Sequence, residues 1–180
     1  MLFRSIIGLD EGPTREVCRE AGVELANLNC PGQLVISGAL PGIAAACDLA
    51  KARGAKKAIP LTVAGAYHSH LMADAKPKLK EALAGVTLHP AFVPVISNVT
   101  ALPHGSRQEI RERLVEQVTS SVRWEESMRH LISQGFTRFI ELGPGLALSG
   151  FMKRIDKSVQ ILNVADLKTL DATAQTLAAT

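Results

Sequence analysis

Residues 23–36 read Val-Glu-Leu-Ala-Asn-Leu-Asn-Cys-Pro-Gly-Gln-Leu-Val-Ile, and this stretch predicts two strands joined by a turn. From Val23 to Asn29, apolar and polar side chains alternate, which is typical of a strand with two different faces. Leu34–Ile36 is a second run that favours a strand. The five residues between the two runs, Asn29–Gln33, contain Pro and Gly, so we expect a turn of the hairpin type.

The segments on either side of this hairpin extend the pattern to residues 1–63. They predict a strand over Leu2–Leu9, a helix opened by Gly12-Pro13 and closed by Gly22, an Ala-rich helix over Pro41–Arg53, and a strand over Ile59–Val63. Pro60 places the last strand at a sheet edge or at its own start. The resulting β-α-β-β-α-β order is that of the ferredoxin-like arrangement.

Residues 64–180 have a different rhythm, in which strands and helices alternate. Helices are predicted over Met72–Leu83, from Ser106 past Val118, over Trp124–Gln134, from Gly145 to Arg154 and over Leu167–Ala178, and strands over Val93–Ser97, Phe136–Leu142 and Gln160–Val164. This alternation indicates an α/β domain with a parallel sheet. Val93–Ser97 lacks alternation, as expected of a strand buried on both faces. A sheet of about three strands is small, so we expect that members are missing.

The composition is that of an ordinary globular protein, with 47% hydrophobic and 21% charged residues in 180. A net charge of +3 is too weak to predict nucleic-acid binding, although it would allow an acidic partner to dock. The three cysteines are widely spaced, which favours a reducing compartment. No stretch approaches the length of a membrane span or a signal sequence, so a cytoplasmic protein is expected.

His68 is the first candidate for chemistry, within Tyr67-His68-Ser69-His70. It follows a predicted strand and the small residues Ala64-Gly65-Ala66, which let another group approach the backbone closely. A histidine at a strand-to-helix junction can present a ring nitrogen to a pocket, and it titrates in the range for proton transfer. From these residues alone, a surface or capping histidine is the simpler alternative. No third ligand accompanies His68 and His70, so no metal site is expected.

Several blocks of the sequence resemble, in order and spacing, segments of malonyl-CoA:acyl carrier protein transacylases. They are Asn27-Leu28-Asn29-Cys30-Pro31-Gly32-Gln33, Tyr67-His68-Ser69-His70-Leu71-Met72, Val95-Ile96-Ser97-Asn98-Val99-Thr100, Val122-Arg123-Trp124 and Glu141-Leu142-Gly143-Pro144-Gly145. The match runs from about Ile6 to the end of the chain. An ordered set of blocks is a far more specific signal than any one of them.

The resemblance implies a fold and a reaction. The fold would be a ferredoxin-like small domain over residues 1–63 and the C-terminal part of an α/β-hydrolase-like large domain over residues 64–180. The reaction is [acyl-carrier-protein] S-malonyltransferase chemistry in fatty acid or polyketide synthesis, with malonyl-CoA and holo-acyl carrier protein as substrates and no bound cofactor. In such a site His68 deprotonates a serine and then the phosphopantetheine thiol. The backbone carbonyl of Gln117 would orient His68, so replacement of the Gln117 side chain should be tolerated.

The sequence departs from the family at the nucleophile. The family's serine sits in a Gly-His-Ser-x-Gly elbow, and none of the serines in these 180 residues has a Gly-x-Ser-x-Gly context. The arginine and glutamine of the family's site also precede the matched region. The chain therefore resembles the C-terminal portion of the enzyme, and we expect it to be inactive alone, with the missing N-terminal part as a partner.

Other polar residues allow two interpretations each. Asn27, Asn29 and Gln33 would bind substrate through amide hydrogen bonds, or they are present because asparagine and its neighbours favour turns. Gly143-Pro144-Gly145 would offer backbone N–H groups to an anion, or it is a tight strand-to-helix turn, which we favour.

Two other functions fit the residues. One is a non-catalytic module that binds acyl carrier protein or a pantetheine thioester. The other is a thiol acyltransferase or hydrolase that uses Cys30 with His68, although a cysteine before proline in a turn is usually inert.

Overall fold

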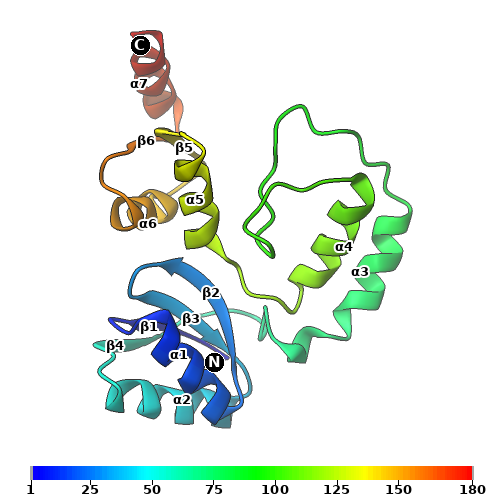
Figure 1. The fold of residues 1–180 in the computed structure, drawn as a ribbon, viewed down its shortest axis with the longest axis vertical. Helices are drawn as coiled ribbons and strands as arrows, with labels where there is room; N and C mark the ends of the chain where they lie inside the picture. The colour runs from blue at the N-terminus through cyan, green and yellow to red at the C-terminus, as the bar shows by residue number, and fades with distance from the viewer. Residues whose placement is uncertain (1, 180) are drawn as a thin grey trace. The chain divides into compact units, whose positions relative to one another are not determined.

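The structure, a computed structural model, describes residues 2–179, and it divides between Ser127 and Met128 into two compact units (Figure 1). The domain division predicted from the sequence, between residues 63 and 64, stays a prediction. Among residues 2–179, every helix is too short or too polar to cross a bilayer.

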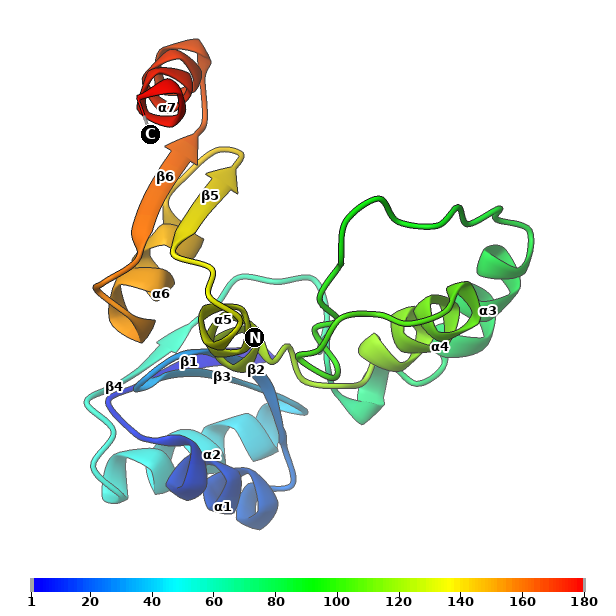
Figure 2. The same ribbon diagram turned by 45° about the horizontal axis from the view of Figure 1, so that its top comes forward.

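The first unit begins with a four-stranded antiparallel sheet. Its strands are β1 (Phe3–Ile7), β2 (Glu24–Cys30), β3 (Gln33–Ser37) and β4 (Lys57–Pro60), in the spatial order β2-β3-β1-β4. Helices α1 (Glu11–Ala21) and α2 (Leu40–Ala52) both lie on one face of this sheet, as Figure 2 shows. The elements follow the order expected from the sequence. Strand β4 lies at an edge of the sheet, as Pro60 indicates. It begins at Lys57, two residues before the predicted start at Ile59, and it ends at Pro60 rather than at Val63.

A continuous apolar core fills the space between the sheet and the two helices. Its fully or almost fully buried members come from β1, α1, β2, β3 and α2, and they include Ile6, Val17, Leu28, Ile36 and Ile43. Burying a side chain of this size stabilises a fold by about 1.5 to 3 kcal/mol. The helices also approach closely at Gly42 of α2, where an added Cβ would lie 2.8 Å from the carbonyl oxygen of Ala21. Leu25 and Leu28 both enter this core, although strict alternation from Val23 to Asn29 would put them on opposite faces of β2. The pairing register shifts between Leu25 and Asn27, and such a bulge changes which face the following side chains occupy.

The rest of the first unit is helical and irregular. A short 3-10 helix (His70–Met72) precedes α3 (Ala75–Ala84), so the single helix predicted over Met72–Leu83 begins later than expected. Helix α4 (Arg107–Gln117) packs against α3. Its N-terminus is capped as the sequence indicates, because the hydroxyl of Ser106 accepts a hydrogen bond from the backbone N–H of Glu109. Helix α5 (Trp124–Ser133) follows, and the division between the two units falls within it.

The prediction of a strand buried on both faces at Val93–Ser97 is wrong. Backbone pairing there is limited to a single bridge between Ile96 and Pro103 and the hydrogen bonds next to it. Val93 and Val95 are 67% and 50% exposed. Pro94 removes one backbone donor, and within residues 2–179 no neighbouring strand lies beside the run to pair with it.

The second unit is a small α/β arrangement. Strands β5 (Arg138–Leu142) and β6 (Gln160–Val164) pair in parallel, as expected, and α6 (Ala147–Ile155) connects them. Helix α7 (Leu167–Ala178) packs against β6. Asp166 caps α7 by accepting a hydrogen bond from the backbone N–H of Thr169 at 2.8 Å.

Candidate active site

The backbone at His68 has an unusual conformation. Its φ is 58°, in the left-handed region that residues other than glycine rarely adopt. Neighbouring contacts hold it there: the fully buried Ser69 donates from its hydroxyl to the carbonyl of Ala66 at 2.6 Å, and the N–H of Met72 donates to the carbonyl of Ser69 at 3.1 Å. Strained residues of this kind persist only when the surrounding structure fixes them.

The imidazole of His68 contacts the end of helix α4. Its Nδ1 atom lies 3.1 Å from the carbonyl oxygen of Gln117, the last residue of that helix. A carbonyl oxygen only accepts hydrogen bonds, so Nδ1 must carry the proton in this contact. The other ring nitrogen, Nε2, then keeps its lone pair, which is the form that a general base requires. The structure thus brings together the two residues that the sequence resemblance paired.

The side chain of Gln117 is engaged as well. Its amide nitrogen donates to the carbonyl of Ser120 at 2.8 Å and to that of Ser121 at 3.4 Å, and it lies 3.4 Å from Nδ1 of His68. The expectation that only the carbonyl of Gln117 matters leaves these contacts out. No sequence signal reveals them, because they depend on how the chain turns after the helix.

The segment after α4 docks on the edge of the sheet. Val122 donates from its backbone N–H to the carbonyl of Ala26 at 2.8 Å and accepts from Leu28 at 2.9 Å, in a parallel bridge opposite Asn27. The hydroxyl of Ser121 donates to the carbonyl of Leu25 at 2.5 Å. The residues that contact the Gln117 side chain are therefore followed directly by Val122, which pairs with the edge strand β2.

A second contact links the histidine loop to the same strand. One carboxylate oxygen of Glu24, at the start of β2, accepts a hydrogen bond from the backbone N–H of His70 at 3.2 Å and also pairs with the Nδ1 atom of that residue. The loop that carries His68 is thus tied to β2 at Glu24 and, through Gln117, at Asn27.

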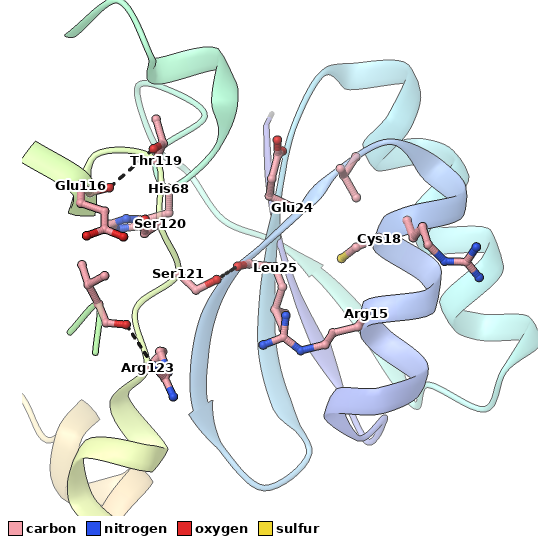
Figure 3. A pocket seen from close by; sticks show the side chains of 13 residues that line it. Arg15, Cys18, Glu24, Leu25, His68, Glu116, Thr119, Ser120, Ser121 and Arg123 are labelled. Atoms are coloured by element: carbon pink, nitrogen blue, oxygen red, sulfur yellow. Dashed lines mark hydrogen bonds between the residues drawn. The ribbon is translucent and has the colours of Figure 1, made fainter. Parts of the chain in front are cut away.

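A cavity of about 520 Å³ opens between these segments and helix α1. Figure 3 shows His68, Ser120 and Ser121 on one side of it and Arg15 and Cys18 of α1 on the other. The side chain of His68 is therefore accessible from a hollow of the first unit, as a group that exchanges protons with a bound molecule must be.

The charged and nucleophilic groups around the cavity are largely occupied. Arg15 pairs with Glu11 at 2.7 Å, and the hydrogen bond that Arg123 donates to the carboxylate of Glu126 raises the pKa of Arg123. Burial raises the pKa of the Cys18 thiol to about 12, so that thiol stays protonated near neutral pH. His68 is the one histidine among the described residues that line the cavity.

The other predicted site residues lie on the hairpin. Asn27 and Asn29 are half-buried in β2, and Gln33 begins β3 opposite Cys30. None of them lines the cavity at His68, and their role in binding substrate stays a prediction. Cys30 is fully buried and does not line that cavity either, which gives no support to the thiol alternative.

In the second unit, a carboxylate occupies the helix end that follows Gly143-Pro144-Gly145. Glu141 accepts hydrogen bonds from the backbone N–H groups of Leu148 and Ser149 at 3.1 and 2.8 Å, and from the Ser149 hydroxyl. Partial burial raises the pKa of Glu141, but these hydrogen bonds outweigh it and lower the pKa overall. Because the backbone N–H groups of Leu148 and Ser149 are already hydrogen-bonded to Glu141, Gly143-Pro144-Gly145 is a strand-to-helix turn rather than an anion site.

Comparison with known proteins gives malonyl CoA-acyl carrier protein transacylases among the most similar relatives. No family model matches the chain. A malonyl CoA-acyl carrier protein transacylase of Bacillus subtilis (strain 168) is 47% identical over 178 residues, which are 96% of this chain and 56% of the relative. The transacylase of Staphylococcus aureus (strain COL) is 34% identical over 169 residues, 91% of this chain and 55% of the relative. The chain thus spans about half the length of the curated relatives it matches.

Solved structures agree with the sequence comparison. The malonyl-CoA:acyl carrier protein transacylase of Xanthomonas oryzae pv. oryzae has a TM-score of 0.94 at 39% identity, over 97% of this chain and 57% of that one. A malonyl-transacylase in complex with its type II PKS acyl-carrier protein has a TM-score of 0.95 at 35% identity, over 97% of this chain and 58% of that one. Over nearly its whole length, the chain is therefore homologous to the malonyl CoA-acyl carrier protein transacylases.

Proposed function

We propose that this chain provides the proton-transfer half of a malonyl transfer site, which moves a malonyl group from malonyl-CoA to the phosphopantetheine thiol of holo-acyl carrier protein. The observation that carries the proposal is the 3.1 Å contact between Nδ1 of His68 and the carbonyl of Gln117. It leaves Nε2 of His68 free of a proton and the ring fixed in direction. The product would serve fatty acid or polyketide synthesis.

The chemistry runs in two halves. In the first, Nε2 of His68 takes the proton of a serine hydroxyl while the serine oxygen attacks the malonyl thioester. As the carbon–sulfur bond breaks, His68 passes this proton to the departing coenzyme A thiolate. In the second, His68 takes the proton of the pantetheine thiol, whose sulfur attacks the malonyl-serine ester. The proton then returns to the serine oxygen as the carbon–oxygen bond breaks.

The serine is proposed to come from a segment outside these 180 residues, because none of the serines here lies in a Gly-x-Ser-x-Gly context. A segment that supplies the nucleophile elbow is then the partner of this chain within one enzyme. The exposed apolar side chains of Phe92, Leu142 and Leu146 support this view, since an isolated domain seldom leaves so much apolar surface uncovered.

The finer description of the fold belongs to the same proposal. The β2-β3-β1-β4 order supports a ferredoxin-like small domain over residues 1–63, and the parallel pair of β5 and β6 supports part of an α/β-hydrolase-like domain within residues 64–180. We also propose that Asn27, Asn29 and Gln33 bind substrate, that no cofactor is needed, and that the protein works in the cytoplasm.

Reconstitution tests the proposal. The chain is mixed with the region of the Bacillus subtilis transacylase that it does not match, and transfer of labelled malonyl from malonyl-CoA to holo-acyl carrier protein is measured. We expect transfer in the mixture and none with either part alone. Intact mass measurement of the chain alone after incubation with malonyl-CoA provides the opposing result: a stable malonyl adduct at one of its serines would show that it holds its own nucleophile.

A second candidate is a non-catalytic module that binds acyl carrier protein. A neighbouring structure in complex with an acyl-carrier protein favours it, as does the lack of the nucleophile motif in these residues. Calorimetric titration of the chain with holo- and apo-acyl carrier protein separates the candidates. Measurable affinity, together with no transfer in the reconstituted mixture, would favour the module.

A further inference from the structure

We propose that the side chain of Gln117, and not only its backbone carbonyl, is a positioning residue that selects the tautomer of His68. This inference rests on the proposed function for its consequence, but its geometry stands on the structure alone. The Gln117 amide nitrogen lies 3.4 Å from Nδ1 of His68, within reach of the same ring nitrogen that contacts the Gln117 carbonyl.

Two arrangements of protons compete at this point. In one, Nδ1 of His68 carries the proton and donates it to the Gln117 carbonyl, so that the ring's Nε2 can act as a base. In the other, Nδ1 is bare and accepts a hydrogen bond from the Gln117 amide, and the ring's Nε2 carries the proton. The second form cannot take a proton from a serine or a thiol.

The carbonyls of Ser120 and Ser121 favour the first arrangement. They accept from the Gln117 amide at 2.8 and 3.4 Å, and a primary amide has only two protons to donate. With both protons directed to these carbonyls, none remains for Nδ1 of His68. The side chain thus keeps its hydrogen atoms away from the ring and leaves the backbone carbonyl as the only acceptor for the Nδ1 proton.

The same amide connects the histidine to strand β2. Ser121 donates to the carbonyl of Leu25, and Val122 exchanges backbone hydrogen bonds with Ala26 and Leu28. The amide of Gln117 therefore closes the turn whose far end is fixed to the sheet. Loss of the amide should let this turn move. The hydrogen bond between Nδ1 of His68 and the Gln117 carbonyl and the backbone pairing of Val122 should then both weaken.

The test is nitrogen NMR of the 180-residue chain labelled at histidine, with the tautomer read from the chemical shifts of the two ring nitrogens above the His68 titration. The variant is Gln117→Met, which keeps the length of the side chain but has no amide. The matched control is Gln108→Met on the same helix, where the amide donates to Glu112 at 2.8 Å on an exposed surface.

In the unaltered chain we expect Nδ1 of His68 to be protonated and Nε2 to be bare. Gln117→Met removes the hydrogen bonds to Ser120 and Ser121 that fix the turn and with it the Gln117 carbonyl beside Nδ1 of His68. The variant should therefore give a mixture of tautomers and should speed hydrogen exchange of the Val122 amide by about fivefold, the effect of losing one net hydrogen bond. Gln108→Met should change neither. Unchanged tautomer and exchange in Gln117→Met would overturn the inference.

Gln117→Glu is a second variant, in case Gln117→Met does not fold. A carboxylate accepts but cannot donate, and its charge favours the imidazolium, so the pKa of His68 should rise by NMR titration. If the pKa of His68 is the same in Gln117→Glu as in the unaltered chain, the inference is contradicted. Because neither readout involves malonyl transfer, failure of the transfer proposal leaves these results interpretable, and the reverse also holds.

Discussion

The Nδ1 atom of His68 and the carbonyl oxygen of Gln117 lie 3.1 Å apart, although 49 positions separate the two residues in the sequence. The contact joins a strained loop to the last residue of a helix, and it does so without a carboxylate. A carbonyl orients the ring and selects its tautomer but adds no full negative charge, so it stabilises the imidazolium less than an aspartate does.

Removing the carboxylate of Glu24 should loosen the loop that carries His68. In Glu24→Ala, the N–H and ring of His70 lose their acceptor, so the free energy of unfolding should fall by about 1 kcal/mol and hydrogen exchange at His70 should rise. Urea titration and amide exchange measure the two effects. Glu16→Ala, an exposed position on α1, is the control, and equal behaviour of the two variants would argue against this tie.

Two apolar substitutions should separate the core of the first unit from its exposed surface. Ile43→Ala, within the buried cluster under the sheet, should lower the free energy of unfolding by about 2 to 5 kcal/mol. Phe92→Ala should change it by less than about 0.5 kcal/mol, because the ring is fully exposed. Urea unfolding of the two variants tests this contrast. A large loss in Phe92→Ala would mean that this loop packs against apolar surface in solution.

Alkylation should distinguish the cysteines. The pKa of Cys18 is raised to about 12, so below that pH the thiol is protonated and iodoacetamide should leave it unmodified in the folded protein. Cys47, which is half-buried, should react first. Mass spectrometry of digested, alkylated protein gives the order. Rapid modification of Cys30 near neutral pH that disappears in His68→Ala would instead support a thiol site.

The cap of helix α6 should make the second unit sensitive to acid. The folded-state pKa of Glu141 is lowered, so its contribution to stability is present above the unfolded pKa and is lost as the pH falls through the folded pKa. Glu141→Gln should therefore weaken the unit near neutral pH and lessen its further loss of stability in acid. The measurement is helix content by circular dichroism from about pH 7 to about pH 3, an interval that includes the ordinary pKa of a glutamate. Asp171→Asn, at an exposed position on α7, should behave like the unaltered chain.

The parts of the fold that follow from local chemistry could be predicted from the sequence. The turn at Pro31-Gly32 and the glycine after α1 each specify a backbone shape that needs no distant partner. The pattern from Val23 to Asn29 predicts a strand, but it does not predict the register shift within that strand. The failure at Val93–Ser97 has the opposite cause. An apolar run predicts burial, but whether it becomes a strand depends on neighbours that the run does not encode.

The site divides in the same way. Sequence periodicity gave no reason to place His68 beside Gln117, and only the resemblance to a family paired them. The contacts of the Gln117 amide with Ser120 and Ser121 were missed altogether, because they arise from the turn after α4 and from its docking on β2. Such contacts are tertiary, and no sequence pattern around a glutamine at a helix end predicts them.

The most direct test of the account is the effect of His68→Ala on malonyl transfer in the reconstituted mixture, with Gln108→Met as the matched control. Loss of a positioned general base should lower the rate of transfer to holo-acyl carrier protein by about 10² to 10⁴-fold, while Gln108→Met should leave it unchanged. A His68→Ala mixture that transfers malonyl within about twofold of the unaltered rate, far less than the expected loss, would contradict the assignment of His68 as the base.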